Sequence, residues 1–231
     1  MTTTCWNPVR ARTSRLTKVS PCGEAVAGAK NSLAFDGFVT VEFSPEYEDG
    51  QESSQKKANG ELAWITKDDD QLKWVTVAIE FTGVNPDAVN LILGQPTVLD
   101  HLGNAVGFRL GQVVPSDWAI ETWTDIPGMA CAAGKPYGYF LAPWLHGGKL
   151  TAWTLENGGA KFKIEGARTQ AGSLWGKGPY DVDLNAGATE ADPPVAGKLL
   201  TPIGGGQHVD MHITFVAPPQ AACAATALVI A

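Results

Sequence analysis

The chain has 231 residues, of which 44% are hydrophobic and 18% charged, a composition that can bury a core and that excludes a disordered polyelectrolyte. Its formal net charge of −7 argues against a protein that grips nucleic-acid phosphates, because such binding needs an excess of Lys and Arg. The 26 Gly and 15 Pro residues favour short strands and turns over a helical bundle, so we expect one mainly β domain over residues 1–231.

The N-terminal segment is basic. It contains Arg10, Arg12, Arg15 and Lys18 and no acidic residue before Glu24, and a strand is predicted over 12–19. Two interpretations stay open: contact with an acidic surface, or an edge strand whose charges discourage pairing with other chains. The apolar run of a signal peptide is absent, and no stretch approaches the ~18 apolar residues of a membrane span. We therefore expect synthesis in the cytoplasm and no membrane partner.

Alternation of apolar and polar residues predicts most of the strands that follow. The clearest run is 72–82, where Val75, Val77, Ile79 and Phe81 alternate with polar or small residues, as in a half-buried strand. Val39, Val41 and Phe43 form a similar apolar face earlier in the chain. Eight to ten strands are expected, and the further ones are 106–110, 118–124, 137–145, 149–156, 161–165 and 208–216.

One short helix is predicted over 86–93. Asn85 can cap its first amides, Pro86 suits the first helical position, and Gly94 ends it. The range 170–207 is instead rich in Gly, Pro, Ala and Asp, which predicts a surface excursion too long for a hairpin connection.

The range 44–62 is almost wholly polar and separates two strand patterns, so it cannot contribute much to a core. It is interpreted as an arm that meets oppositely charged surface on a neighbour, or else as a solvated loop. The residues assigned to this arm are Glu46, Tyr47, Glu48, Asp49, Glu52, Lys56 and Lys57. We expect the arm to be disordered in the free monomer and to order on assembly.

Residues suited to catalysis or metal binding are few. His208, Asp210 and His212 alternate on one predicted strand, so they could share a face and bind zinc. The opposite face of this strand is apolar and consists of Val209, Met211, Ile213 and Phe215. The three polar residues are therefore interpreted as the polar side of an amphipathic strand. Asp68, Asp69 and Asp70 lack the ligand spacing of a calcium loop and predict a solvated turn. With no phosphate-binding, nucleophile or dinucleotide motif, we expect no catalytic residue, no cofactor and no metal site.

Cysteine and tryptophan admit further alternatives. The four cysteines, Cys5, Cys22, Cys131 and Cys223, are expected to be free thiols, with a Cys5–Cys22 bridge as the alternative. The eight tryptophans suit cores and subunit interfaces, but exposed tryptophans also form sugar platforms. A carbohydrate-binding β-sandwich is therefore the alternative function.

An ordered set of segments resembles the major tail proteins, or tail tube proteins, of actinobacterial long-tailed bacteriophages (siphophages). The segments span nearly the whole chain: Cys5-Trp6-Asn7-Pro8 through Cys22-Gly23, Phe35-Asp36-Gly37-Phe38 leading into 44–50, 55–61, 79–88, 175–180 and 213–219. Each segment alone has little specificity, and their order along the chain carries the resemblance.

The resemblance implies a β-sandwich or split-barrel tail tube fold with one flanking helix, here 86–93, and long loops. It implies a structural, non-enzymatic subunit of the virion tail that self-assembles into stacked hexameric rings forming the conduit for DNA ejection, with 44–62 as the inter-subunit arm. The partners implied are further copies of the chain, the tape measure protein, the terminator and tip proteins, and phage DNA in transient, non-specific passage. Assembly is expected in the host cytoplasm, and an acidic inner wall would keep DNA from adhering.

Overall fold

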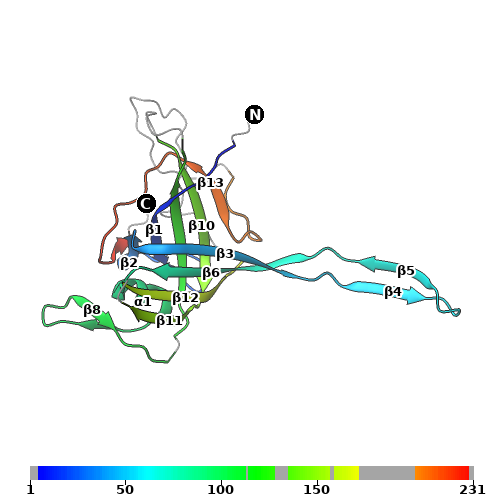
Figure 1. The fold of residues 1–231 in the computed structure, drawn as a ribbon, viewed down its shortest axis with the longest axis horizontal. Helices are drawn as coiled ribbons and strands as arrows, with labels where there is room; N and C mark the ends of the chain where they lie inside the picture. Colours follow the sequence, from blue (N-terminus) through cyan, green and yellow to red (C-terminus); the bar gives the residue numbers. More distant parts are fainter. Residues whose placement is uncertain (1–4, 113, 128–134, 157–158, 172–200, 229–231) are drawn as a thin grey trace.

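The computed structural model describes residues 5–112, 114–127, 135–156, 159–171 and 201–228 (Figure 1). The described elements are β1 (Ala11–Lys18), β2 (Gly28–Phe35), β3 (Phe38–Glu48), β4 (Glu52–Lys56), β5 (Leu62–Lys67), β6 (Gln71–Phe81), α1 (Pro86–Leu93), β7 (Thr97–Leu99), β8 (Ala105–Phe108), β9 (Asp117–Asp125), β10 (Tyr137–His146), β11 (Lys149–Glu156), β12 (Gly159–Thr169), β13 (Asp210–Thr214) and β14 (Thr226–Leu228). All of their strand pairings are antiparallel. The expected mainly β, sandwich-like fold with one short helix is confirmed.

A ten-stranded sheet forms the body of the protein. Its strand order is β14-β2-β1-β9-β10-β12-β6-β3, with β13 added to β10 and β11 added to β12. The C-terminal end of β12 joins β10, where Leu145 pairs with Thr169 and His146 with Arg168. Beyond this junction, β3 and β6 run across the direction of β10 (Figure 1).

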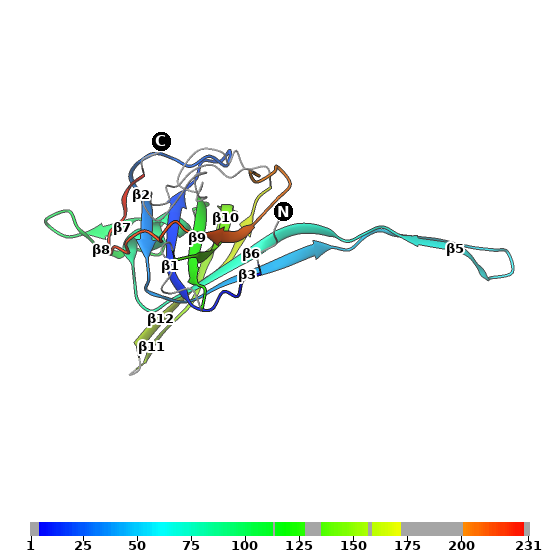
Figure 2. The ribbon, with the colours of Figure 1, turned by 90° about the horizontal axis from the view of Figure 1, so that it is seen from above.

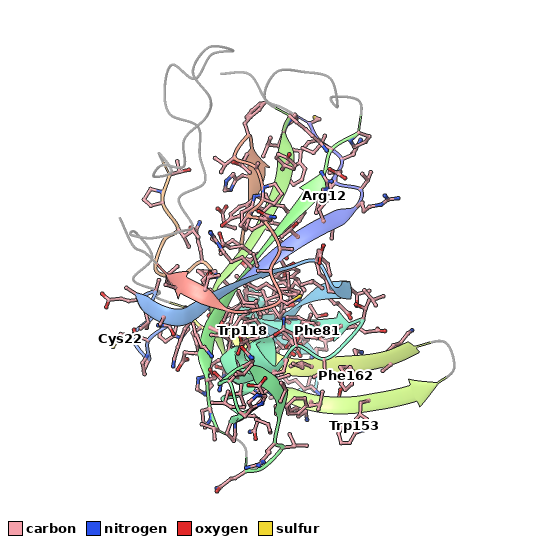
Figure 3. All side chains as sticks on the ribbon, turned by 90° about the vertical axis from the view of Figure 1, so that its left-hand side faces the viewer. Arg12, Cys22, Phe81, Trp118, Trp153 and Phe162 are labelled. Carbon is pink, nitrogen blue, oxygen red and sulfur yellow. The ribbon has the colours of Figure 1, made fainter. Side chains whose placement is uncertain are left out.

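The main core takes side chains from both parts of this sheet and from α1. Trp118 of β9 is fully buried in it, and its indole N–H donates to the carbonyl of Gly147 over 2.9 Å. Figure 3 shows Trp118 and Phe81 at the centre of the molecule. The four apolar residues predicted on the inner face of β6 are all buried there or beside it. Burial of such side chains is the main favourable term in folding.

The helix α1 has the predicted bounds and end residues. The side-chain oxygen of Asn85 accepts hydrogen bonds from the amides of Asp87 and Ala88, both over 3.1 Å. Gly94 takes the left-handed conformation with φ 63°, and its amide donates to the carbonyl of Asn90. The apolar face of the helix packs into the main core, as the sequence predicts.

The prediction of an edge strand at the basic N-terminus was wrong, because β1 lies between β2 and β9. Arg15 stands directly opposite Glu121 of β9 and binds its carboxylate. Arg12 lies 3.6 Å from a carboxylate oxygen of Asp125 on the same strand. Arg12 and Arg15 of β1 therefore meet acidic residues of β9 in the same chain.

Two predicted apolar faces were right only in part. Val41 and Phe43 of β3 pack on the core as expected. In β3 the register shifts between Phe38 and Thr40, so Val39 is exposed while Phe38 packs on the core. In the β7–β8 hairpin, Val106 is exposed, as is Leu110 just beyond it, and Phe108 alone of the three expected residues packs on the core. A bulge changes which side chains face inward, and periodicity alone does not locate it.

The structure describes more strands than the eight to ten expected. The additional strands β2, β4, β5, β7 and β14 are short or carry polar residues that weaken the alternation. Cys5, Cys22 and Cys223 are free and exposed, so the alternative Cys5–Cys22 bridge was wrong. Cys131 and most of the expected excursion 170–207 lie outside the described residues.

Candidate assembly surface

A long hairpin projects from the body of the protein along the long axis of the molecule (Figure 1). We call residues 49–70 the arm. It contains β4 and β5, which pair from Glu52 with Lys67 to Lys56 with Leu62, and it turns at 57–60. All side chains of the two strands are exposed. Figure 2, seen from above, shows the arm again clear of the rest of the chain.

The residues assigned to the arm from the sequence are distributed along this projection. Glu46, Tyr47 and Glu48 end β3, Asp49 follows, Glu52 and Lys56 lie on β4, and Lys57 begins the turn. The range 44–62 thus includes the end of a strand paired to β6 and stops where the return strand begins. Sequence reasoning missed β5 as part of the arm. The disorder expected for 44–62 in the free monomer stays a prediction.

Large apolar side chains are exposed on the arm and at its root, by which we mean the adjoining ends of β3 and β6. Leu62, Trp64 and Ile65 of β5 are 50%, 47% and 53% exposed, and Tyr47 of β3 is 62% exposed. A two-stranded hairpin is marginally stable in water by itself, and clustered exposed apolar residues mark interaction surfaces. The arm therefore has the composition of an element that another surface covers.

A tight crossing joins the arm to the body. The amide of Asp68 donates to the carbonyl of Gln51 over 3.1 Å, and the amide of Gly50 donates to a carboxylate oxygen of Asp70 over 2.9 Å. A Cβ atom on Gly50 would lie 1.8 Å from the carbonyl oxygen of Asp68. Only glycine fits between the strands. The three aspartates are exposed, as expected, but they form part of this crossing and not a turn.

Gly50→Ala should separate the two strands at the crossing while leaving the body folded. We expect the amide protection of Asp68 against hydrogen exchange to fall by about tenfold or more, since tenfold corresponds to about 1.4 kcal/mol. Hydrogen exchange measured by NMR or mass spectrometry tests this. Gly107→Ala is the matched control, because its Cβ would meet the Cβ of Val98 at an ordinary 3.9 Å. Unchanged protection in the Gly50 variant would contradict the predicted steric role.

Hydrogen bonds hold carboxylates at the root of the arm in their charged form. The hydroxyl of Thr76 donates to Glu46 over 2.6 Å and lowers the pKa of that carboxyl. The Gly50 amide, followed by Lys67, lowers the pKa of Asp70. Lys73 lies 2.6 Å from a carboxylate oxygen of Glu48. The root is thus acidic at neutral pH.

The His208, Asp210 and His212 alternation does not form the polar outer face predicted for it. His208 is buried, Asp210 and His212 are half-buried, and Met211 from the predicted apolar face is 59% exposed. Pairing with β10 places His212 opposite Tyr139, and the centroids of the two rings lie 5.0 Å apart. Among the described residues, no group of three or more His, Cys, Asp or Glu side chains is placed to hold a metal ion.

His208 should make the protein less stable in weak acid. Burial lowers its pKa, so the folded protein favours the neutral ring, whose Nδ1 lies 2.8 Å from the hydroxyl of Thr169. The unfolded chain protonates near pH 6.5, so this stability is present above that pH and is lost as pH falls towards the folded pKa. The free energy of unfolding should fall with a slope of at most about 1.4 kcal/mol per pH unit.

Urea unfolding of the wild type and His208→Gln between pH 7.5 and 5.0 measures this slope. The difference between the two proteins isolates His208 from the other histidines. Equal slopes would contradict the prediction.

A buried charged network, missed by the sequence reasoning, lies on the second face of β9. Arg15 donates two hydrogen bonds to Glu121, over 2.5 and 2.6 Å, and the hydroxyl of Tyr139 donates a third over 2.7 Å. The Glu121 side chain is fully buried. These groups are fully engaged with one another, which is typical of a structural network rather than a reactive site.

The tryptophans differ in exposure. Trp118 and Trp123 are buried, whereas Trp64 on the arm and Trp153 on β11 are about half exposed, at 47% and 54%. These two exposed rings lie on separate hairpins, and Figure 3 labels Trp153 at the edge of the molecule. Trp175 lies outside the described residues.

Comparison with known proteins leaves the family open. No protein-family model matches the chain, and a search of curated proteins finds no significant match. Within the described part of the chain, no helix is long and apolar enough to cross a membrane.

Proposed function

We propose that the chain is the structural subunit of a bacteriophage tail tube, which assembles into stacked hexameric rings and forms the conduit for DNA ejection. The observation that carries this proposal is the arm, which exposes Leu62, Trp64 and Ile65 on a hairpin far from the core of its own chain. Such a hairpin gains stability only when a second surface covers it. Segments of the chain resemble those of tail tube proteins and follow the same order. This resemblance is the reason for proposing stacked rings as the kind of assembly.

The remaining features agree with a passive conduit. The net charge of −7 suits a wall that repels DNA phosphates and lets them pass. The partners in this proposal are further copies of the chain along the tube, with the tape measure protein inside and the terminator and tip proteins at the ends. The site of action is the virion tail.

The test compares the full chain with a variant in which an Asn-Gly turn replaces residues 52–67. Gln51 and Asp68 are already hydrogen bonded, so a two-residue turn can close the hairpin between them. We expect rings or hollow tubes of uniform width from the wild type in negative-stain electron microscopy, and monomers from the variant in light scattering over the same concentrations. A wild type that stays monomeric under all conditions would contradict the proposal.

Trp64→Ser should weaken assembly while Trp153→Ser should not. Both rings are about half exposed on hairpins, so the two changes remove similar exposed apolar surface. A tryptophan at the centre of an interface contributes about 2 kcal/mol or more, which corresponds to roughly a 30-fold rise in the concentration needed for assembly. Light scattering over a concentration series measures this rise.

If both variants assemble like the wild type, the Trp64 side chain does not contribute to the contact between copies. Glycan-array binding that is lost in Trp153→Ser would instead favour the carbohydrate-binding alternative.

A further inference from the structure

Two adjoining hollows lie beside the C-terminal segment of the described chain. The larger, of about 510 Å³, is lined by Arg10, Arg12 and Tyr137 and by residues 217–221. The smaller, of about 270 Å³, lies between 35–37, 81–85 and 221–223. Asp36 and Ala221 line both hollows. We call them together the groove.

The two ends of the groove differ in chemistry. At the first end Arg10 is exposed and has no ion pair among the described residues, while Arg12 is about half exposed and reaches Asp125 only over 3.6 Å. At the second end lie Phe35 and Phe81, which belong to the main core and are each only 5% exposed, and Val84, which is 48% exposed. Figure 3 labels Arg12 and Phe81, one from each end. The groove thus offers positive charge beside apolar surface.

The arm carries the complementary chemistry. Residues 49–70 contain six acidic residues and three lysines. Asp49, Glu52, Asp68 and Asp69 have no ion pair among the described residues, so their charge is available to a partner. The exposed apolar residues of β5 lie on the same hairpin. Acidic and apolar groups on one projecting element match a groove that is basic at one end and apolar at the other.

The arm of the same chain does not occupy this groove. It points away from the body in both ribbon views (Figure 1, Figure 2). A contact between arm and groove therefore joins two copies. Where each arm enters the groove of a further copy, and two copies do not simply exchange arms, the contact is heterologous and its repetition generates a ring or an open filament.

We propose that the groove binds the arm of a second copy of this chain, with Arg10 and Arg12 facing arm carboxylates and with the exposed Val84 contacting its apolar side chains. This inference rests on the proposed function and adds the surface that receives the arm.

Charge reversal tests the contact with two full-length variants. The groove variant carries Arg10→Glu and Arg12→Glu, and the arm variant carries Asp49→Lys and Glu52→Lys. We expect each alone to need at least about tenfold more protein to assemble, because like charges then face each other. Lys30→Glu with Arg109→Glu is the matched control, since it makes the same change in net charge at exposed positions outside the groove.

Mixing the two variants in equal amounts should restore assembly. The basic arm of one variant then meets the acidic groove of the other, and the remaining arm and groove keep their natural charges. Light scattering and electron microscopy give the readout, and circular dichroism checks that each variant is folded.

A groove variant that assembles like the wild type would overturn the inference, as would two defective variants that stay unassembled when mixed. Either result leaves the proposed function intact if the arm-replaced protein remains monomeric. A wild type that never assembles would overturn both.

Discussion

Glu121→Leu is expected to lower the free energy of unfolding by about 3–5 kcal/mol, because it removes one partner of a buried ion pair. The lost carboxylate is fully buried and accepts hydrogen bonds from Arg15 and Tyr139. Its removal leaves the guanidinium, whose side chain is only 17% exposed, without its paired charge. Urea unfolding in the arm-replaced background measures the loss without a contribution from assembly.

A double-mutant cycle separates the ion pair from simple packing. Arg15→Met should also destabilise the protein, since it leaves the Glu121 carboxylate buried beside Tyr139. The double variant Arg15→Met, Glu121→Leu should lose much less than the sum of the single changes, because two apolar side chains of similar size need no charged partner. Additive losses would show that the two side chains act independently and would contradict this account.

Trp118→Ala should cost about 3–5 kcal/mol, the usual range for truncating a fully buried tryptophan. The indole fills the main core and donates to the partly buried Gly147 carbonyl, so the change leaves a cavity and removes a hydrogen bond from that carbonyl. In a chain of this size such a loss lowers the midpoint of thermal unfolding by roughly 6–20 °C. Differential scanning calorimetry of the arm-replaced protein measures the shift.

Trp153→Ala is the control for this loss. Its ring is 54% exposed on β11, so the same substitution should change stability by less than about 0.5 kcal/mol. Equal effects at the two positions would mean that burial does not govern the contribution of tryptophan to this fold.

The sequence predicted local features well. The helix over 86–93 and its two caps depend on Asn85, Pro86 and Gly94, which act on their own neighbours in the chain. The alternation in β6 depends on the pleat, which places every second side chain on one face whatever its partner strand. A polar projection near 44–62 could also be predicted, since a long polar run between strands has no place in a core.

The candidate site was predicted only in part. The polar residues of the outgoing strand indicated an arm, but Leu62, Trp64 and Ile65 of the return strand have the composition of a buried strand. Their exposure follows from the pairing of β4 with β5, which no pattern within β5 reveals. The groove is likewise built from segments that lie far apart in the chain.

The sequence by itself determined the β class, the helix, the β6 face and the absence of a long apolar run, because each depends on residues close together in the chain. The tertiary structure decided which strands are central and which faces are buried. Arg15 became an internal ion-pair partner through Glu121, 106 residues away, and His208 is buried against Thr169, 39 residues away. Both outcomes depend on long-range pairing, since the same alternation fits an edge strand and a central one until the neighbouring strand is known.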